Sequence, residues 1–160
     1  MGIYFIPKQT MFKFGSMISR DAVIQKKYLK DGDITCGYIS GIMFANKIGL
    51  TTQVPTAYEV VTNRATSDYR ETSLASVKVI LRKPKVTITK ENYRILQLLD
   101  LLKDIDSITE VEGDRLKKRM LGYMKEMMLT FPMLEPYLVY YPDRLYRNMY
   151  EAGVLNGVSA

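Results

Sequence analysis

The stretch that decides the expected fold is Gly37-Tyr38-Ile39-Ser40-Gly41-Ile42-Met43-Phe44-Ala45-Asn46-Lys47-Ile48-Gly49-Leu50-Thr51-Thr52-Gln53-Val54-Pro55. In its first half, four residues have the spacing i, i+3, i+4, i+7 that places side chains on one face of a helix. These residues are Ile39, Ile42, Met43 and Asn46. Gly49 stands where a helix C-terminal glycine belongs, and Pro55 disfavours α conformation in the residue before it. The stretch predicts a short buried helix followed by a sharp polar corner.

Asn46 is the unusual residue of this helix because it shares the apolar face. A buried amide needs hydrogen-bond partners, and the backbone of the Thr51–Gln53 turn is the nearest candidate. We therefore expect Asn46 to be buried and bonded to that turn. Two interpretations follow: a structural corner locked by its own polar groups, or a recognition surface that the corner displays.

The same residues resemble the signature of the AbiEi-type antitoxins of type IV toxin–antitoxin (abortive infection) systems. In that pattern a small residue and a glycine precede a helix that ends in Ala-Asn-x-x-Gly-Leu, and Ser/Thr-Thr-Gln-Val-Pro follows. The matching residues are Ser40, Gly41, Ala45, Asn46, Gly49, Leu50, Thr51, Thr52, Gln53, Val54 and Pro55. The resemblance continues into residues 58–63, more weakly into 98–102, and spans most of residues 2–105.

The resemblance implies an antitoxin that opposes a cognate nucleotidyltransferase-like toxin, by direct contact or functionally. Full-length members of the family also act as transcriptional regulators, because they repress their own promoter through an N-terminal winged helix. The run Ile3–Ile6, ended by Pro7, is similar to the last strand of that winged helix. We therefore expect a C-terminal antitoxin module without the DNA-reading helix, and no promoter-specific binding by this chain.

Candidate partner-binding residues come from the corner and from the end of the next expected strand: Asn46, Thr51, Thr52, Gln53, Thr62, Asn63 and Arg64. If that strand pairs beside the corner, these side chains converge on one polar surface. An arginine there can hold a carboxylate or phosphate bidentately. The structural alternative is that these residues only fix the turn.

The length of 160 residues and the 47% hydrophobic content suffice for a real core. We expect an antitoxin α+β core over residues 1–110 and a helical extension packed on it over residues 111–160. The sequence has no apolar run of 18 residues and no secretory signal pattern, so no membrane partner is expected. A single cysteine, Cys36, fits the cytoplasm.

The net charge of +6 belongs mainly to the segment before Glu91. A basic N-terminal half supports an alternative function, a non-enzymatic nucleic-acid-binding or transcriptional regulatory module. The candidate nucleic-acid contacts are Arg82, Lys83 and Lys85, whose structural alternative is an exposed, charge-protected strand end.

The chemistry of the side chains points away from catalysis. There is no histidine and one cysteine, so a zinc site or a Cys/His nucleophile pair has no parts. No phosphate-binding glycine loop is present, and the carboxylates between Asp100 and Asp114 are typical of helix caps and solvated charge. We expect no enzyme activity, metal or cofactor. The alternative is an enzyme that reverses nucleotidyl transfer or modifies the toxin with Asp, Glu, Lys or Tyr of perturbed pKa.

The expected fold is α+β, with a small antiparallel or mixed sheet packed by several helices and a helical C-terminal third. Helices are expected over 20–30 after a Ser19 cap, from Thr89 onward, over 114–129 and over 143–152. Strands are expected over 34–36, 57–62, 74–82 and 86–88, with a loop over 63–72. Ile95, Leu98, Leu99 and Leu102 form an apolar stripe.

Overall fold

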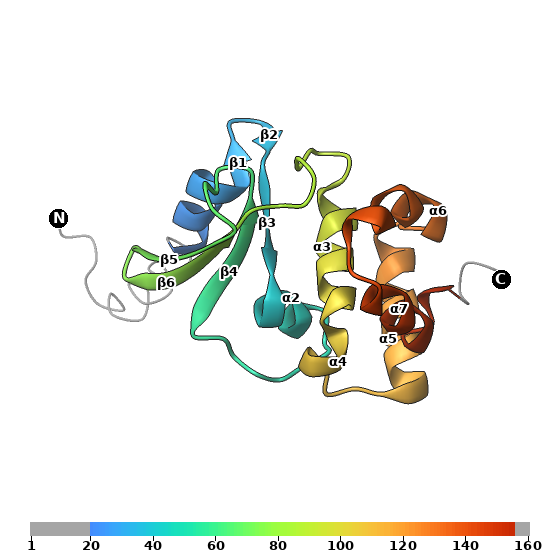
Figure 1. Cartoon of the computed structure of the whole chain (residues 1–160). Helices are drawn as coiled ribbons and strands as arrows, with labels where there is room; N and C mark the ends of the chain where they lie inside the picture. The colour runs from blue at the N-terminus through green and yellow to red at the C-terminus, as the bar shows by residue number, and fades with distance from the viewer. Residues whose placement is uncertain (1–19, 156–160) are drawn as a thin grey trace.

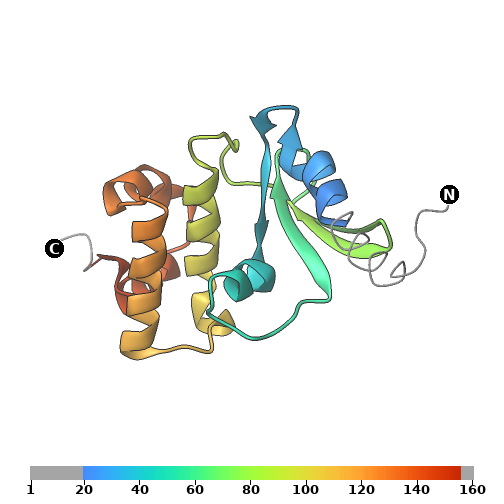
Figure 2. The same ribbon diagram turned by 180° about the vertical axis from the view of Figure 1, so that it is seen from behind.

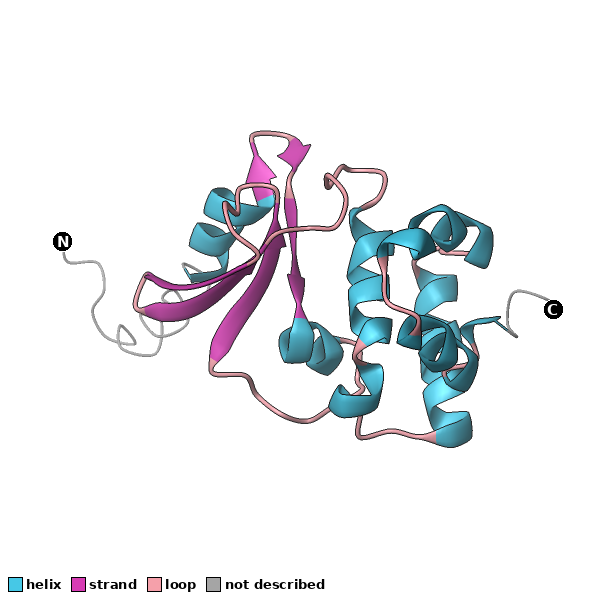
Figure 3. Cartoon of the chain, in the orientation of Figure 1, coloured by secondary structure: helices cyan, strands magenta, loops and turns pink. Residues whose placement is uncertain are grey.

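Two halves lie side by side in the computed structural model, which describes residues 20–155. A small sheet with one helical segment forms the first half, and a group of helices forms the second (Figure 1, Figure 3). Strands and helices are largely segregated along the chain, and this arrangement confirms the α+β class with a helical C-terminal third. The expected cap Ser19 and the run Ile3–Ile6 lie outside the described residues.

The described chain opens with the helical segment that the sequence predicts before Gly32. Residues 20–24 are α-helical, and a π-helical turn, η1 (Gln25–Leu29), completes the segment. A minimal hairpin follows, in which β1 (Lys30–Asp31) pairs antiparallel with β2 (Ile34–Thr35). The helix and the short strand at 34–36 are therefore confirmed in position.

The main sheet is built from four strands: β3 (Gly37–Ser40), β4 (Ala57–Thr62), β5 (Tyr69–Leu74) and β6 (Val77–Arg82). Their order in space is β3-β4-β6-β5, with β4 parallel to β6 and antiparallel pairs on either side. The sheet is thus mixed. Gly37 pairs with Thr62 and Ser40 pairs with Glu59, so the start of β3 lies beside the end of β4.

Four of the sequence predictions are wrong in this region. The expected strand 74–82 is divided between β5 and β6 by a turn at Ala75 and Ser76, which both have positive φ. Ile39 belongs to strand β3 rather than to the following helix, which begins at Gly41. Strand β5 occupies part of the expected loop 63–72. The sequence did not indicate this edge strand because its side chains are mostly polar and exposed. The segment 86–88 is no strand, since the side chain of Asn63 binds both the N–H and the C=O of Ile88.

The two faces of the sheet are covered by different elements. The segment 20–29 packs on one face, where Ile24 and Tyr28 meet the inward side chains Val60, Val79 and Leu81. The inward direction predicted for Val79 and Leu81 is thereby confirmed. Tyr38 and Val61 point the other way and join the core of the helical half.

Seven helical elements follow β3 in the described chain: α2 (Gly41–Lys47), α3 (Tyr93–Lys103), α4 (Ile105–Ile108), α5 (Gly113–Glu126), α6 (Phe131–Leu134), the 3₁₀ turn η2 (Glu135–Tyr140) and α7 (Arg144–Glu151). Within residues 20–155, none of them has the length and apolar content needed to cross a lipid bilayer. Figure 2 shows α3 between the sheet with α2, on one side, and the later helices α5, α6 and α7, on the other.

Helix α3 is the central element of the fold. Thr89 and Asn92 exchange side chain–backbone hydrogen bonds before its first turn, so the helix begins a few residues later than the Thr89 cap predicts. The predicted stripe of Ile95, Leu98, Leu99 and Leu102 is buried, and Leu96 and Leu101 are buried as well. An α3 side chain also protects the sheet edge, where Gln97 Nε2 donates to the Ile39 carbonyl at 2.8 Å.

The larger hydrophobic cluster contains residues from both sides of position 110. Tyr38, Phe44 and the α3 leucines contribute from one side, and Met120 and Leu145 are among those that contribute from the other. The α5 residues Leu116, Met120 and Met124 are buried as the sequence predicts. A second, smaller cluster lies under the segment 20–29.

Helices α2 and α5 end in the same hydrogen-bond pattern. After α2, Gly49 N–H bonds the Asn46 carbonyl and Leu50 N–H bonds the Ala45 carbonyl. After α5, Met128 and Leu129 repeat this geometry onto Lys125 and Met124. Gly49 (φ 84°) and Met128 (φ 57°) both occupy the left-handed region. Because methionine carries a Cβ, its cap is strained where the glycine cap is not.

We expect substitutions at these two cap residues to change the stability of the fold in opposite directions. Met128→Gly removes left-handed strain from a side chain that is 77% exposed, and should stabilise the fold by about 1 kcal/mol. Gly49→Ala introduces the strain, so it should destabilise by about 1 kcal/mol, while the exposed end of Arg119 can move away from the new Cβ. Urea unfolding of both variants measures this. Equal effects in the same direction would contradict the cap assignment.

Candidate functional site

The corner after α2 is held by a carboxylate from a distant part of the chain. Glu110 accepts hydrogen bonds from the Thr51 hydroxyl, from the Thr52 hydroxyl at 2.9 Å and from the Thr52 N–H at 3.2 Å. Its own N–H donates to the Leu50 carbonyl at 2.7 Å. Hydrogen bonds from Thr51 and then Thr52 lower the pKa of Glu110. The sequence placed Glu110 among ordinary solvated acids, and no local pattern links it to the corner.

Asn46 behaves only in part as predicted. Its Nδ2 donates to the Gln53 carbonyl at 2.8 Å, which confirms the expected bond to the turn. The residue is exposed, however, so its predicted burial is wrong. With Ile39 in the strand, α2 turns Phe44 and Ala45 into the core instead. The buried polar residue of the corner is Thr51, whose Oγ1 also accepts from the Gln53 N–H at 3.1 Å.

The second predicted group, at the end of β4, is occupied by internal contacts. Thr62 Oγ1 lies 2.7 Å from the Tyr28 carbonyl and accepts from the Arg64 N–H at 3.1 Å. Asn63 binds the Ile88 backbone through its side chain. Arg64 donates to the Lys27 carbonyl at 2.6 Å and pairs with Asp31 at 3.3 Å.

The two predicted groups do not converge on one surface. Strand β4 runs antiparallel to β3, so Thr62 lies beside Gly37 at one end of the pair. The corner follows α2, which continues from the other end of β3 (Figure 1). The hypothesis of a shared polar surface is therefore wrong, and the corner and the strand end are separate features.

The predicted nucleic-acid residues lie near the end of β6. The guanidinium of Arg82 stacks over the ring of Tyr69, with its Cζ 5.0 Å from the ring centroid. Lys83 and Lys85 are exposed in the segment that follows. Arg82 pairs with Val61, which places this basic group beside the Thr62 end of the sheet.

A groove of about 1440 Å³ runs between the two halves of the molecule. Its walls come from the segment 20–29, β3, α2, α3 and α5, which can be followed in Figure 2 from the blue helix past the teal one to the yellow and orange ones. Lys47, Ile48 and Asn46 line it, so the helix that leads into the corner forms part of its wall. Six cationic side chains line the groove: Lys30, Lys47, Arg94, Arg115, Lys118 and Arg119.

Most of these cations come from the half of the sequence that is richer in acids. Arg115, Lys118 and Arg119 are spaced i, i+3, i+4 on α5 and are exposed. The average charge of that segment concealed them, because of its acids only Glu126 lines the groove. The basic field predicted for the first half is therefore incomplete. The helical spacing of the three cations was the signal that could have revealed the groove.

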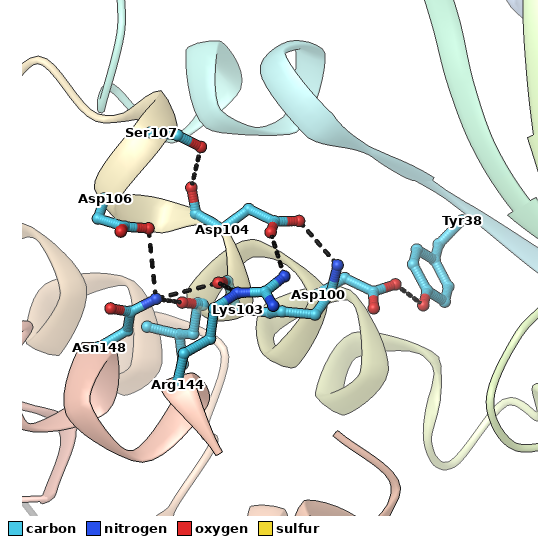
Figure 4. A network of polar contacts seen from close by, with 9 residues as sticks. Tyr38, Asp100, Lys103, Asp104, Asp106, Ser107, Arg144 and Asn148 are labelled. Carbon is cyan, nitrogen blue, oxygen red and sulfur yellow. Dashed lines mark hydrogen bonds and ion pairs between the residues drawn. The ribbon is translucent and has the colours of Figure 1, made fainter. Parts of the chain in front are cut away.

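Behind the groove wall lies a carboxyl group in an unusual environment (Figure 4). The Tyr38 hydroxyl donates to Asp100 Oδ2, which joins β3 to α3. Some of the Asp100 surface stays accessible, yet its carboxylate lies deep among protein atoms. Burial raises the pKa of Asp100 to about 6, against the lowering effect of the Tyr38 hydrogen bond and of Lys103. Burial and Asp100 also raise the pKa of Tyr141.

The neighbouring acids bind cations, and side chains of α7 cap the C-terminal end of α3. Asp104 is held by Lys103 at 2.8 Å and Arg144 at 2.9 Å, and these partners lower its pKa overall although burial alone would raise it. Asn148 of α7 donates to the Leu102 carbonyl at 2.8 Å and to the Lys103 carbonyl at 3.0 Å (Figure 4). These contacts give Asp104 and Asn148 structural roles, and Asp100 itself does not line the groove.

Comparisons with known proteins give no match: no family model, no curated protein and no solved structure is similar to this chain at a significant level. Within residues 20–155, no group of three or more His, Cys, Asp or Glu side chains is placed to hold a metal ion.

We expect Thr51, not Asn46, to be the energetically important polar residue of the corner. Thr51→Val keeps the shape of a buried side chain but removes its bonds to Glu110 and Gln53, and should destabilise the fold by about 1–3 kcal/mol. Thr52→Val is the matched control, because Thr52 is exposed and should cost much less. Thermal unfolding compares the two, and equal costs would contradict the assigned role of Thr51.

Asp100 should give the fold a distinctive pH dependence. Its pKa is higher in the folded chain than the ordinary value of 3.8, so the folded state binds the extra proton between about pH 4 and pH 6. Stability from this group is present at low pH and is lost as the pH rises through that window, by on the order of 3 kcal/mol. Asp100→Asn should remove the effect in urea titrations at pH 4, 5, 6 and 7.

Asp104→Asn is the control for this titration. Because the pKa of Asp104 is lowered in the fold, its contribution has the opposite sign and weakens as the pH falls. The two variants should therefore change the slope of stability against pH in opposite directions. A slope unchanged by Asp100→Asn would show that this carboxyl does not titrate as described.

Proposed function

We propose that this chain is a non-enzymatic antitoxin module of an AbiEi-like system, which acts in the cytoplasm against a cognate nucleotidyltransferase-like toxin. The proposal rests first on the sequence resemblance of residues 40–55. The observation that carries it is that these residues form one stapled unit, tied by Asn46 to Gln53 and by Glu110 to Thr51 and Thr52. A signature that folds into one rigid corner is suited to presenting a fixed surface to a partner.

The exposed tip of the corner supplies the contact surface in this proposal. Val54 is 84% exposed, the most exposed of the large hydrophobic residues in residues 20–155. Gln53 is exposed next to it, and its hydrogen bonds in the described structure use only its backbone. The side chains of both residues are thus free of structural duties. A projecting apolar group beside a free amide is the composition of a small protein-contact site.

The test is relief of growth arrest in cells that express the cognate toxin. The wild-type chain should restore growth on co-expression. The double variant Gln53→Ala/Val54→Asp should lose at least tenfold in surviving colonies while keeping its melting temperature, because neither side chain is buried. Immunoblots of toxin and antitoxin establish that the variants and the wild-type chain are expressed at equal levels.

Val139→Asp is the matched control, since Val139 is 78% exposed on η2 in the helical half. It should rescue as well as the wild-type chain. Failure of the wild-type chain to rescue would overturn the antitoxin proposal. A folded corner variant that rescues normally would remove the tip from the mechanism.

A further inference from the structure

The groove between the two halves carries positive charge that the protein does not neutralise. Its six cations face two carboxylates, Asp21 and Glu126, and Asp21 already accepts a hydrogen bond from Tyr58. Among the ion pairs formed within residues 20–155, none involves any of the six. Gathered like charges repel one another, and an anionic ligand removes that cost.

The cations come from several elements that line the groove, so a ligand in it meets charges spread along its length. Arg115, Lys118 and Arg119 project from α5, whereas Lys47 and Lys30 belong to the wall formed by α2 and the β1 segment. The Arg119 guanidinium lies next to Gly49, where an added Cβ would be 2.2 Å from its Nη1. This distribution fits an extended anion rather than a single phosphate.

Aromatic rings stand among these charges. Tyr123 is held edge-to-face against Phe44, with ring centroids 5.7 Å apart, and Tyr93 carries the Arg94 guanidinium 5.5 Å from its ring centroid. Both tyrosines are half-buried and line the groove. Rings fixed among cations are the arrangement on which unpaired bases stack while their phosphates meet positive charge.

From this juxtaposition of unpaired cations and fixed tyrosines along one groove, we propose that the chain binds single-stranded nucleic acid between α5 and β3. The volume of about 1440 Å³ exceeds that of ordinary small-molecule pockets and accommodates several nucleotides. A duplex hides the faces of its bases in the stack, so the tyrosines could not reach them. An acidic polypeptide would satisfy the cations but offers no bases for the rings.

The binding experiment uses the full chain and fluorescently labelled oligothymidylate and oligouridylate of about 12 nucleotides, measured by anisotropy. Binding should weaken steeply with salt, with a slope of roughly −0.7 for each phosphate contacted. A labelled duplex of the same length should bind at least tenfold more weakly. The inference does not depend on the antitoxin proposal, since no toxin is present in this measurement.

Variants locate the site. Arg115→Glu/Lys118→Glu should weaken binding at least tenfold and flatten the salt slope. Tyr93→Ala should weaken it roughly 5- to 150-fold, the effect of losing one stacked base. Lys83→Glu/Lys85→Glu changes the net charge equally but lies outside the groove, and should stay within about twofold of wild type. Melting temperatures establish folding, and Arg115→Gln/Lys118→Gln replaces the reversal variant if that one unfolds.

Several results would overturn the inference. Duplex bound as tightly as single strand, or a larger loss from the Lys83/Lys85 variant than from the groove variant, would place binding elsewhere. Displacement of the oligonucleotide by polyglutamate at equal charge concentration would assign the groove to an acidic polypeptide. Unchanged binding by a folded groove variant would show that these cations do not meet the phosphates.

Discussion

Packing against helix α3 is the constraint on which the two halves of this protein depend. Six of its eleven residues are buried hydrophobic side chains, which is more than one amphipathic face can hold. One side of the helix meets Tyr38 of the sheet half, and its C-terminal carbonyls are bound by Asn148 of α7. A polar substitution on any of its buried sides would therefore loosen the sheet half, the helical half or both.

The charges of the molecule follow two different rules. Acids at the C-terminal end of α3 are paired, as Asp104 is with Lys103 and Arg144, and they serve the architecture. The cations of α5 that face the groove have no such partners among the described residues. The C-terminal segment beyond Glu91, in which acids slightly outnumber bases, therefore presents a basic face through α5. The sign of a segment's net charge thus says little about the surface that it presents.

Local patterns predicted what local physics decides. The β-branched run at 57–62 is strand β4 at its predicted bounds, and the leucine stripe of α3 is buried because its period matches the helix. Gly49 predicted the end of α2, while Met128 ends α5 in the same conformation without the glycine that would have announced it. Strand β5 was missed because an edge strand needs no apolar alternation.

The candidate site was less predictable because its contacts are long-range. Nothing near Glu110 in sequence points to Thr51, and the antiparallel direction of β4 decides that Arg64 lies far from the corner. Asn46 was assigned to the correct partner but to the wrong environment, since α2 buries the face that carries Phe44 and Ala45. The groove exists only where strands and helices from both halves meet, and no single segment of sequence describes it.

The contact between Gln97 and the Ile39 carbonyl has a consequence for self-association. Strand β3 is an outer strand of the sheet, and a free strand edge is a template for adding a strand from another molecule. Gln97 occupies a carbonyl on β3, while the opposite edge, β5, carries the exposed charges Arg70 and Glu71. The Gln97 amide thus hydrogen-bonds one edge of the sheet, and charged side chains cover the other. Both features discourage edge-to-edge aggregation at high protein concentration.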